Sequence, residues 1–342
     1  MPNQLLVREI NITATMNLAL FEKLLHQNFI SEEEFDAIKK QQEKPISIHW
    51  DLRTLLYAGI LLVTTALGIL VYENINTIGH SVIIITIGIL CAACFIYCFR
   101  KATGYSSAKK ESPGILYDYI LLTGCLLLLI FVAYLQFQYN VFGNRWGLAV
   151  FIPMVILFFA AYYFDHLAVL SIAITNLAAW LGITVTPAEI LKENNFSDVR
   201  LIYTGMVLGA GLIIFSLVAK RKKIKDHFAF IYKNFGAHIL FIALLAALFY
   251  YDDVYLIWFI VLIAVSFLSF KNAVQENSFY FLVITVLYAY IGLCYVVLKL
   301  LFIAAGGMGN IYLVSIYFIG SGIALIKFLM HYNKKLKHDA GV

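Results

Sequence analysis

The sequence predicts an all-α polytopic membrane protein with about ten transmembrane helices. Apolar residues make up 62% of the 342 residues and charged residues only 13%, whereas soluble domains hold roughly 45–50% and 25%. The mean hydropathy is +0.85. The apolar residues also gather in segments of about 20, the length that an α-helix needs to cross a bilayer. A soluble enzyme, a nucleic-acid-binding protein and a disordered chain are therefore disfavoured.

Residues 1–50 are more polar than the rest and are predicted to form a short cytoplasmic helical hairpin. Apolar residues from Leu18 to Leu25 recur at helical spacing. Ser31 and Glu34 then have the spacing of a capping box, with Ile30 placed as a hydrophobic staple. We expect this hairpin to be an oligomerisation or docking element, or alternatively a small cap on the membrane domain.

A membrane domain is predicted over 51–332, followed by a cytoplasmic tail over 333–342. Its apolar segments are 54–72, 81–99, 116–138, 146–164, 167–186, 201–219, 236–251, 254–270, 279–301 and 311–330. Asp165 and His166 alone separate the fourth span from the fifth, and Asp252 and Asp253 lie between the seventh and the eighth. Since charged residues are costly in hydrocarbon, both pairs predict tight turns between helices.

The distribution of Lys and Arg predicts that both termini are cytoplasmic, because these residues stay on the cytoplasmic side of a membrane. With ten spans, twenty-one of the 25 basic residues fall on the side of the N-terminus. The net charge of +5 is therefore a signal of topology and does not indicate a nucleic-acid partner. We expect a multi-pass protein of the bacterial inner membrane.

Small residues inside the spans predict helix packing. Cys91, Cys94 and Cys98 share one helix face, and a CxxC can indicate a metal or redox site, but this segment lacks the His or acidic neighbours that a metal would need. We therefore expect the cysteines to pack as small apolar residues and predict neither a metal nor a cofactor. Gly205 and Gly209 form a GxxxG motif that predicts a close approach between helices.

The predicted outer ends of the spans carry polar residues that could form an outward-facing pocket if they converge. The alternative is an aromatic belt with solvated loops. The candidate pocket residues are Glu73, Asn74, His80, Gln136, Arg145 and Asp252. No catalytic residues are predicted.

Two further polar sets are candidates. Asn176, Trp180 and Thr184 lie along a similar face of one span and could line a cavity, or else make hydrogen bonds between helices. A basic run after the sixth span could contact anionic lipid head groups, or could simply be a strong anchor on the cytoplasmic side. The residues of this run are Lys220, Arg221, Lys222, Lys223 and Lys225.

The order of features resembles a prokaryotic membrane-protein family, the domain-of-unknown-function 2157 family. The residues that carry the resemblance are the segment 28–34, Asn-Phe-Ile-Ser-Glu-Glu-Glu, and the phrase 71–76, Val-Tyr-Glu-Asn-Ile-Asn, at the end of the first span. The resemblance covers mainly residues 18–100. It implies a multi-pass bacterial inner-membrane protein and supplies no activity or catalytic residues.

The sequence leaves three functions open. The first is a non-enzymatic transport or translocation component for a small or lipid-like solute. The second is a membrane sensor or scaffold that acts through the N-terminal hairpin and through association with itself or another membrane protein. The third is a membrane enzyme that acts on a lipid-linked substrate. Membrane lipids are expected partners in each case, and nucleic acid is not.

Overall fold

The computed structural model describes Leu25, Gln27, Phe29–Glu32, Phe35 and residues 49–73, 79–102, 104–110, 112–185, 199–304 and 309–339. Within these ranges every regular element is helical, which confirms the all-α fold class. The chain divides into two units, Met1–Ile69 and Leu70–Val342, and each is described by itself.

The first unit contains most of the helix α3 (His49–Glu73). Near the N-terminus the backbone N–H of Phe35 donates to the carbonyl of Ser31 over 3.0 Å, so a helical turn begins where the capping box was predicted. Glu34 and most of the predicted hairpin lie outside the described residues.

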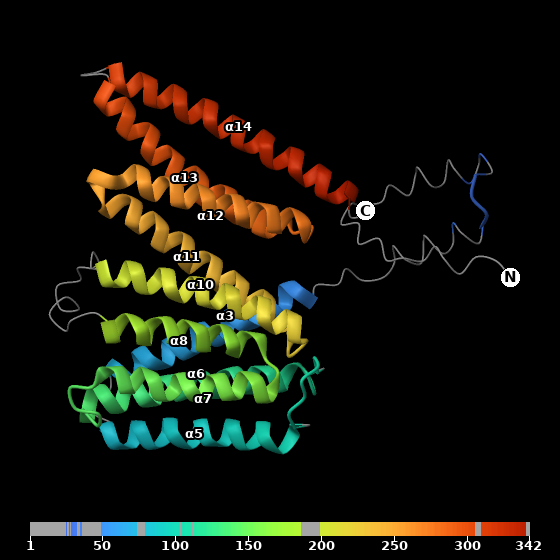
Figure 1. The fold of residues 1–342 in the computed structure, drawn as a ribbon. Helices are drawn as coiled ribbons and strands as arrows, with labels where there is room; N and C mark the ends of the chain where they lie inside the picture. Colours follow the sequence, from blue (N-terminus) through green and yellow to red (C-terminus); the bar gives the residue numbers. More distant parts are fainter. Residues whose placement is uncertain are drawn as a thin grey trace. The chain divides into compact units, whose positions relative to one another are not determined.

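The second unit is a series of membrane-length helices that pack as antiparallel neighbours along the chain (Figure 1). They are α5 (His80–Lys101), α6 (Ile115–Tyr139), α7 (Trp146–Phe164), α8 (Leu167–Val185), α10 (Val199–Lys222), α11 (Ala229–Tyr250), α12 (Tyr255–Gln275), α13 (Phe279–Ala304) and α14 (Gly309–Asp339). The short 3-10 helices η1 (Asp226–Phe228) and η2 (Asp252–Val254) precede α11 and α12.

All ten predicted spans coincide with helices of the described chain. Nine are long and apolar enough to cross a membrane, and the apolar part of α3, Thr54–Leu70, is shorter. Asp165 and the Asp252–Asp253 pair lie at turns between helices, as the cost of charge in hydrocarbon predicted. The structure therefore supports a polytopic membrane protein.

The helices α11 and α14 extend furthest beyond their predicted spans. α11 begins at Ala229 rather than near 236, because Tyr232 packs in the core and Lys233 pairs with Glu276, so the first turn tolerates a charge. α14 continues to Asp339, a length of about 46 Å. Its Leu336 packs against Ala273 and other residues of α12 and α13. Residues 333–339 of the predicted tail are thus helical.

The helices pair into the hairpins α5–α6, α7–α8, α10–α11 and α12–α13. The largest apolar core joins α5, α6, α7 and α8 to the beginning of α11, with Leu121, Leu157, Ile174 and Phe228 fully buried. Cys98 is a fully buried member of this core, as expected for a small packing residue, and Cys125 of α6 is also fully buried there.

The closest approach between helices is that of α10 and α11. A Cβ added at Gly209 would lie 2.6 Å from the backbone nitrogen of Leu240, and one at Gly236 would lie 2.8 Å from the carbonyl oxygen of Gly209. A Cβ at Gly205 would lie 3.2 Å from the Cβ of Ala243. The GxxxG motif therefore brings the two backbones together, which confirms its predicted role.

We predict that Gly209→Ala destabilises the protein by about 1–3 kcal/mol, because the new methyl group forces the two backbones apart. Gly211→Ala is the matched control: a Cβ there meets nothing within 4 Å, and alanine improves helix propensity by up to about 1 kcal/mol. Thermal unfolding in detergent micelles measures both variants. Equal melting temperatures for the two would contradict the packing role of Gly209.

Candidate functional site

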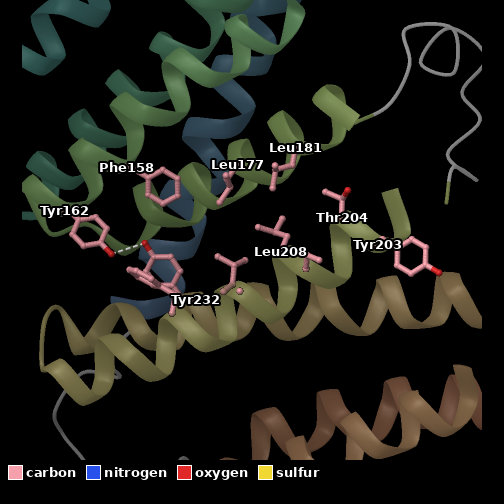
Figure 2. A pocket seen from close by; sticks show the side chains of 12 residues that line it. Phe158, Tyr162, Leu177, Leu181, Tyr203, Thr204, Leu208 and Tyr232 are labelled. Carbon is pink, nitrogen blue, oxygen red and sulfur yellow. Dashed lines mark hydrogen bonds between the residues drawn. The ribbon is translucent and has the colours of Figure 1, made fainter. Parts of the chain in front are cut away.

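A groove of about 860 Å³ lies between the α7–α8 hairpin and the α10–α11 hairpin. Figure 2 shows side chains from all four helices around it. The twelve lining residues are Phe158, Tyr162, Leu177, Leu181, Tyr203, Thr204, Val207, Leu208, Gly211, Leu212, Phe215 and Tyr232. The groove follows α10 from Tyr203 to Phe215, which is about 18 Å of helix.

The lining of the groove is aromatic and aliphatic, and none of the twelve residues is charged. Val207 is 74% exposed, so one side of the groove is open at the surface of the helices. Gly211 contributes to the width of the groove because no side chain projects from it and a Cβ there would meet no atom within 4 Å. Such a surface suits an apolar chain.

Hydroxyl groups lie at both ends of the groove. At one end the hydroxyls of Tyr162 and Tyr232 are hydrogen-bonded to each other over 3.0 Å (Figure 2). At the other end the Tyr251 hydroxyl donates to the Tyr203 hydroxyl over 3.2 Å, and Thr204 adds a further hydroxyl. The groove therefore offers neutral hydrogen-bonding groups at its ends and an apolar wall between them.

A buried ionic cluster lies beside the Tyr162–Tyr232 end. The ring of Phe228 packs against Tyr162 with 5.2 Å between centroids, and its centroid lies 4.6 Å from that of the His227 ring. His227 Nε2 lies 2.6 Å from Asp165 Oδ1, and Lys225 Nζ lies 2.7 Å from the same oxygen. We call Asp165, Lys225 and His227 the ionic cluster.

The turn between α7 and α8 places Asp165 in this cluster. Asp165 has a φ of 58° in the left-handed region, which a short polar residue tolerates better than a branched apolar one. The backbone N–H of His166 then returns to the carbonyl of Ala161 over 3.1 Å and ends the helix. The carboxylate accordingly leaves α7 toward the α10–α11 loop, where Lys225 also has a positive φ of 50°.

A third segment completes the cluster. The backbone N–H of Lys110, before α6, donates to Asp165 Oδ2 over 2.6 Å. The backbone N–H of Lys225 donates to the carbonyl of Ser107 over 2.9 Å. The Lys225 ammonium also lies 5.5 Å from the centroids of the Tyr105 and Phe228 rings. Three loops from distant parts of the sequence therefore meet at one carboxylate.

The ionic cluster is shielded from solvent. The Asp165 side chain is 2% exposed, that of Lys225 1% and that of His227 13%. Burial acts to raise the pKa of Asp165, but the hydrogen bonds from Lys225, the Lys110 backbone and His227 outweigh it, and the pKa lies below its ordinary value. The carboxylate is therefore held in its charged form.

A second buried acid, Asp118, lies near the beginning of α6. Asp118, which is 4% exposed, accepts a hydrogen bond of 2.5 Å from the Ser112 hydroxyl. His166 Nε2 lies 3.8 Å from the same carboxylate. Asp118 in α6 and Asp165 in the α7–α8 turn thus each have a histidine nearby.

The structure does not bring the described candidate pocket residues into one site. His80 Nδ1 bonds to the Tyr134 hydroxyl on α6 over 2.7 Å, whereas Asp252 pairs with Lys299 on α13, at the other side of the helix series (Figure 1). Glu73 is exposed at the end of α3. Asn74 lies outside the described residues.

Gln136 and Arg145 belong to the turn between α6 and α7. Gln136 is 1% exposed, and its amide bonds to Asn140, Phe142 and Gly143 of the same turn. Arg145 is the exposed N-cap residue of α7. In the described structure Gln136 therefore stabilises a turn, because its hydrogen-bonding groups are used locally.

The predicted intramembrane polar residues face α7 and their own helix. Asn176 Nδ2 donates to the carbonyl of Ile172 over 3.2 Å, and the Thr184 hydroxyl donates to the carbonyl of Trp180 over 2.7 Å. Trp180 packs on Phe151 of α7 with 5.1 Å between ring centroids. The groove is lined instead by Leu177 and Leu181 of α8.

The predicted basic set divides into two parts. Lys220, Arg221, Lys222 and Lys223 are exposed, and Lys220 pairs with Glu276 over 3.1 Å. The predicted lipid contact is wrong for Lys225. This residue is 1% exposed and paired with Asp165, so it does not reach lipid head groups. The left-handed backbone at Lys223 and Lys225 turns the chain inward after the exposed bases.

The groove and the ionic cluster were not predicted from the sequence. In the sequence Asp165 and His166 indicate a turn, and Lys225 belongs to a basic run. Nothing in that pattern indicates that Asp165 and Lys225 form a buried ion pair. A hint was available: the loops that hold Lys110, Asp165 and Lys225 all fall on one side of the predicted membrane. That common side is what lets them meet.

The family comparison confirms the resemblance seen in the sequence. Residues 22–170 match the family model described as "Predicted membrane protein (DUF2157)". The DUF2157 match extends beyond the expected residues 18–100 as far as the beginning of α8, and it covers fewer than half of the 342 residues. It includes Asp118 and Asp165, and it ends before Lys225. No curated protein and no solved structure matches the chain.

We predict that Lys225→Met destabilises the protein by about 3–5 kcal/mol, because it leaves a buried carboxylate without its ammonium partner. Lys223→Met removes an exposed ammonium two residues away and is expected to change stability by less than about 0.5 kcal/mol. Chemical or thermal unfolding in detergent measures the difference. Equal stabilities would contradict the buried pair.

The same cluster predicts a dependence of stability on pH. Because the pKa of Asp165 is lowered on folding, its contribution is fully present above its unfolded pKa of about 4 and is lost as the pH falls through the lower folded pKa. Asp165→Asn is expected to flatten this acid limb of the stability curve. An unchanged acid limb in the variant would show that Asp165 does not carry it.

Proposed function

We propose that this membrane protein binds a lipid-like molecule with an uncharged polar group in the groove between the α7–α8 and α10–α11 hairpins, as a translocation component. The observation that carries the proposal is a groove of about 860 Å³ with an apolar, uncharged wall and hydroxyl groups at its ends. Its open side allows a molecule to enter from the surrounding hydrocarbon.

The length of the groove suits the acyl chains of a lipid. The segment from Tyr203 to Phe215 extends about 18 Å, more than half of the roughly 30 Å thickness of the hydrocarbon core. The side chains along it, such as Leu177, Leu181 and Leu208, offer a continuous apolar wall. The volume also lies within the range of about 300–1,000 Å³ typical of ligand pockets.

The lining favours an uncharged polar group over a phosphate or carboxylate. Burying a charge without a partner costs far more than burying a hydroxyl or carbonyl that finds a hydrogen bond. The charges of the ionic cluster are paired with each other, and the Phe228 ring contacts both Tyr162 and His227. A hydroxyl or ester group could exchange hydrogen bonds with the tyrosine pair.

We also propose that the protein lies in the bacterial inner membrane with both termini in the cytoplasm. The excess of Lys and Arg on one side supports this orientation. The basic loop after α10, the loop before α6 and the end of α12 lie close together, through Lys225–Ser107 and Lys220–Glu276. In this orientation the ionic cluster lies at the cytoplasmic end of the groove.

We predict that Gly211→Leu blocks lipid binding, because the new side chain projects into the groove without a clash at its Cβ. The probe is a photoactivatable diacylglycerol in liposomes that contain the purified protein, and mass spectrometry of the labelled peptides locates the adducts. Wild type is expected to be labelled on groove residues of α8 and α10, and Gly211→Leu to lose most of that labelling.

Gly320→Leu is the matched control, since Gly320 is an exposed helical glycine of α14 whose Cβ also meets nothing within 4 Å. It is expected to keep the labelling of wild type. A photoactivatable phosphatidylglycerol is expected to label the groove less than diacylglycerol does. Labelling spread evenly around the helices, and equal in both variants, would mean ordinary contact with bulk lipid and would contradict the proposal.

The orientation predicts that reporter tags fused to the N-terminus and to the C-terminus are both active on the cytoplasmic side. Two reporters measure the side of each terminus in cells. One is a phosphatase that is active only outside the cytoplasm, and the other is a fluorescent protein that folds only inside it. Tags on opposite sides, or both outside, would contradict the proposed orientation.

A further inference from the structure

We propose that the ionic cluster of Asp165, Lys225 and His227 is a latch that holds the groove closed at the end where Tyr162 and Tyr232 meet, and that its release lets the two hairpins separate there. This inference rests on the proposed function in one respect: the molecule that enters the opened groove is taken to be lipid-like. It adds to the proposed binding site a movement of the two hairpins relative to each other, which the contacts of Asp165 control.

The first argument is position. The groove lies between the α7–α8 and α10–α11 hairpins, so its width depends on how those hairpins are held together. Asp165 is the turn of the first hairpin, and Lys225 and His227 belong to the turn of the second. The contacts of 2.7 and 2.6 Å between these residues therefore join the two walls of the groove at one end.

The second argument is continuity between the cluster and the groove. His227 adjoins the Phe228 ring, Phe228 packs against Tyr162, and Tyr162 is hydrogen-bonded to Tyr232. Tyr162 and Tyr232 line the groove and come from opposite hairpins. A separation of Asp165 from Lys225 thus draws apart the residues whose hydroxyl contact closes this end of the groove.

The third argument is the chemistry of the cluster. Two cationic or potentially cationic groups share one carboxylate oxygen, while the backbone N–H of Lys110 holds the other oxygen. A buried ion pair contributes little net stability compared with well-packed apolar residues, but breaking it from one side is costly. Such a contact is either fully made or fully broken, which suits a latch with two states.

The groups around the ionic cluster come from three loops and the beginning of α6. Lys225, Asp226 and His227 lie on the α10–α11 loop, Lys110 and Tyr105 on the α5–α6 loop, and His166 with Asp118 beside the α7–α8 turn. Because the α5–α6 loop binds Asp165 and Lys225 through its backbone, it can stay with either hairpin when the latch opens. The contacts of Asp165 with Lys225 and His227 are ionic contacts that join the two hairpins directly.

The experiment measures the distance between the two hairpins in the full-length protein in liposomes. Spin labels are placed at Leu167, at the beginning of α8, and at Lys222, at the end of α10, since both side chains are exposed. The five native cysteines are replaced by alanine or serine in this background. Pulsed electron–electron double resonance then gives the distribution of distances between the two spin labels, and no lipid probe is needed.

In the parent protein the distribution is expected to be narrow. Asp165→Asn removes the charge that Lys225 and His227 share, and we expect loss of the short-distance population in favour of longer distances. Asp165→Glu, which keeps the charge, is expected to retain part of the short population. His227→Gln removes one partner only and is expected to produce a smaller loss, which keeps the test available if Asp165→Asn fails to fold.

Glu276→Gln is the matched control. It breaks an ionic contact at the same end of the helices, but that contact joins the α10–α11 hairpin to the α12–α13 loop and does not cross the groove. We expect it to leave the Leu167–Lys222 distances unchanged. Folded Asp165→Asn and His227→Gln proteins with the distances of the parent would overturn the latch.

The diacylglycerol labelling separates the two proposals. In Asp165→Asn liposomes the Tyr162–Tyr232 end is expected to gain labelling relative to the Tyr203 end. Longer hairpin distances without any groove labelling in the parent would support the latch and remove the proposed ligand. Groove labelling that depends on Gly211, together with unchanged distances, would support the ligand and remove the latch.

Discussion

The cost of a charge in an apolar medium is the constraint on which the rest of this structure depends. It places Asp165 and the Asp252–Asp253 pair at turns, and so fixes where the helices reverse. It also explains why Lys225, which lies inward of the exposed basic run, is paired with a carboxylate. The same cost leaves the groove with a lining of hydroxyl and apolar groups, because its charged neighbours are paired with each other.

Helix α10 shows how two nearby glycines can have opposite effects. Gly209 faces α11, where its missing Cβ lets the backbones come together. Gly211 faces the groove, where its missing Cβ leaves space open. Helix α10 thus packs closely on α11 at Gly209 and lines the groove between the α7–α8 and α10–α11 hairpins at Gly211. The α10–α11 hairpin is therefore suited to move as a unit against α7–α8.

The groove and the ionic cluster are two parts of one arrangement. Tyr162 and Tyr232 meet at one end of the groove, Phe228 packs against Tyr162, and Asp165 contacts Lys225 and His227 of the α10–α11 loop. At this end the two hairpins are therefore joined by an ionic contact beside the apolar packing of Phe228 and Tyr232.

The family match and the site overlap only in part. The DUF2157 match includes Asp165, but the residues that complete the ionic cluster, Lys225 and His227, lie on the α10–α11 loop beyond the matched segment. The function proposed for this chain therefore depends on helices beyond the matched segment. It has to be tested on the full chain.

The sequence by itself determined the fold class, the ten helices, most of their ends and the GxxxG joint, because each depends on local hydropathy, on the cost of charge or on the size of one residue. It could not separate Lys225 from the exposed bases beside it, nor show that Leu177 and Leu181, rather than Asn176, face the groove. Those outcomes depend on the rotation of each helix and on contacts between loops far apart in the chain. Only the tertiary structure decides them, because the side chains of an apolar helix can face lipid or protein at nearly equal cost.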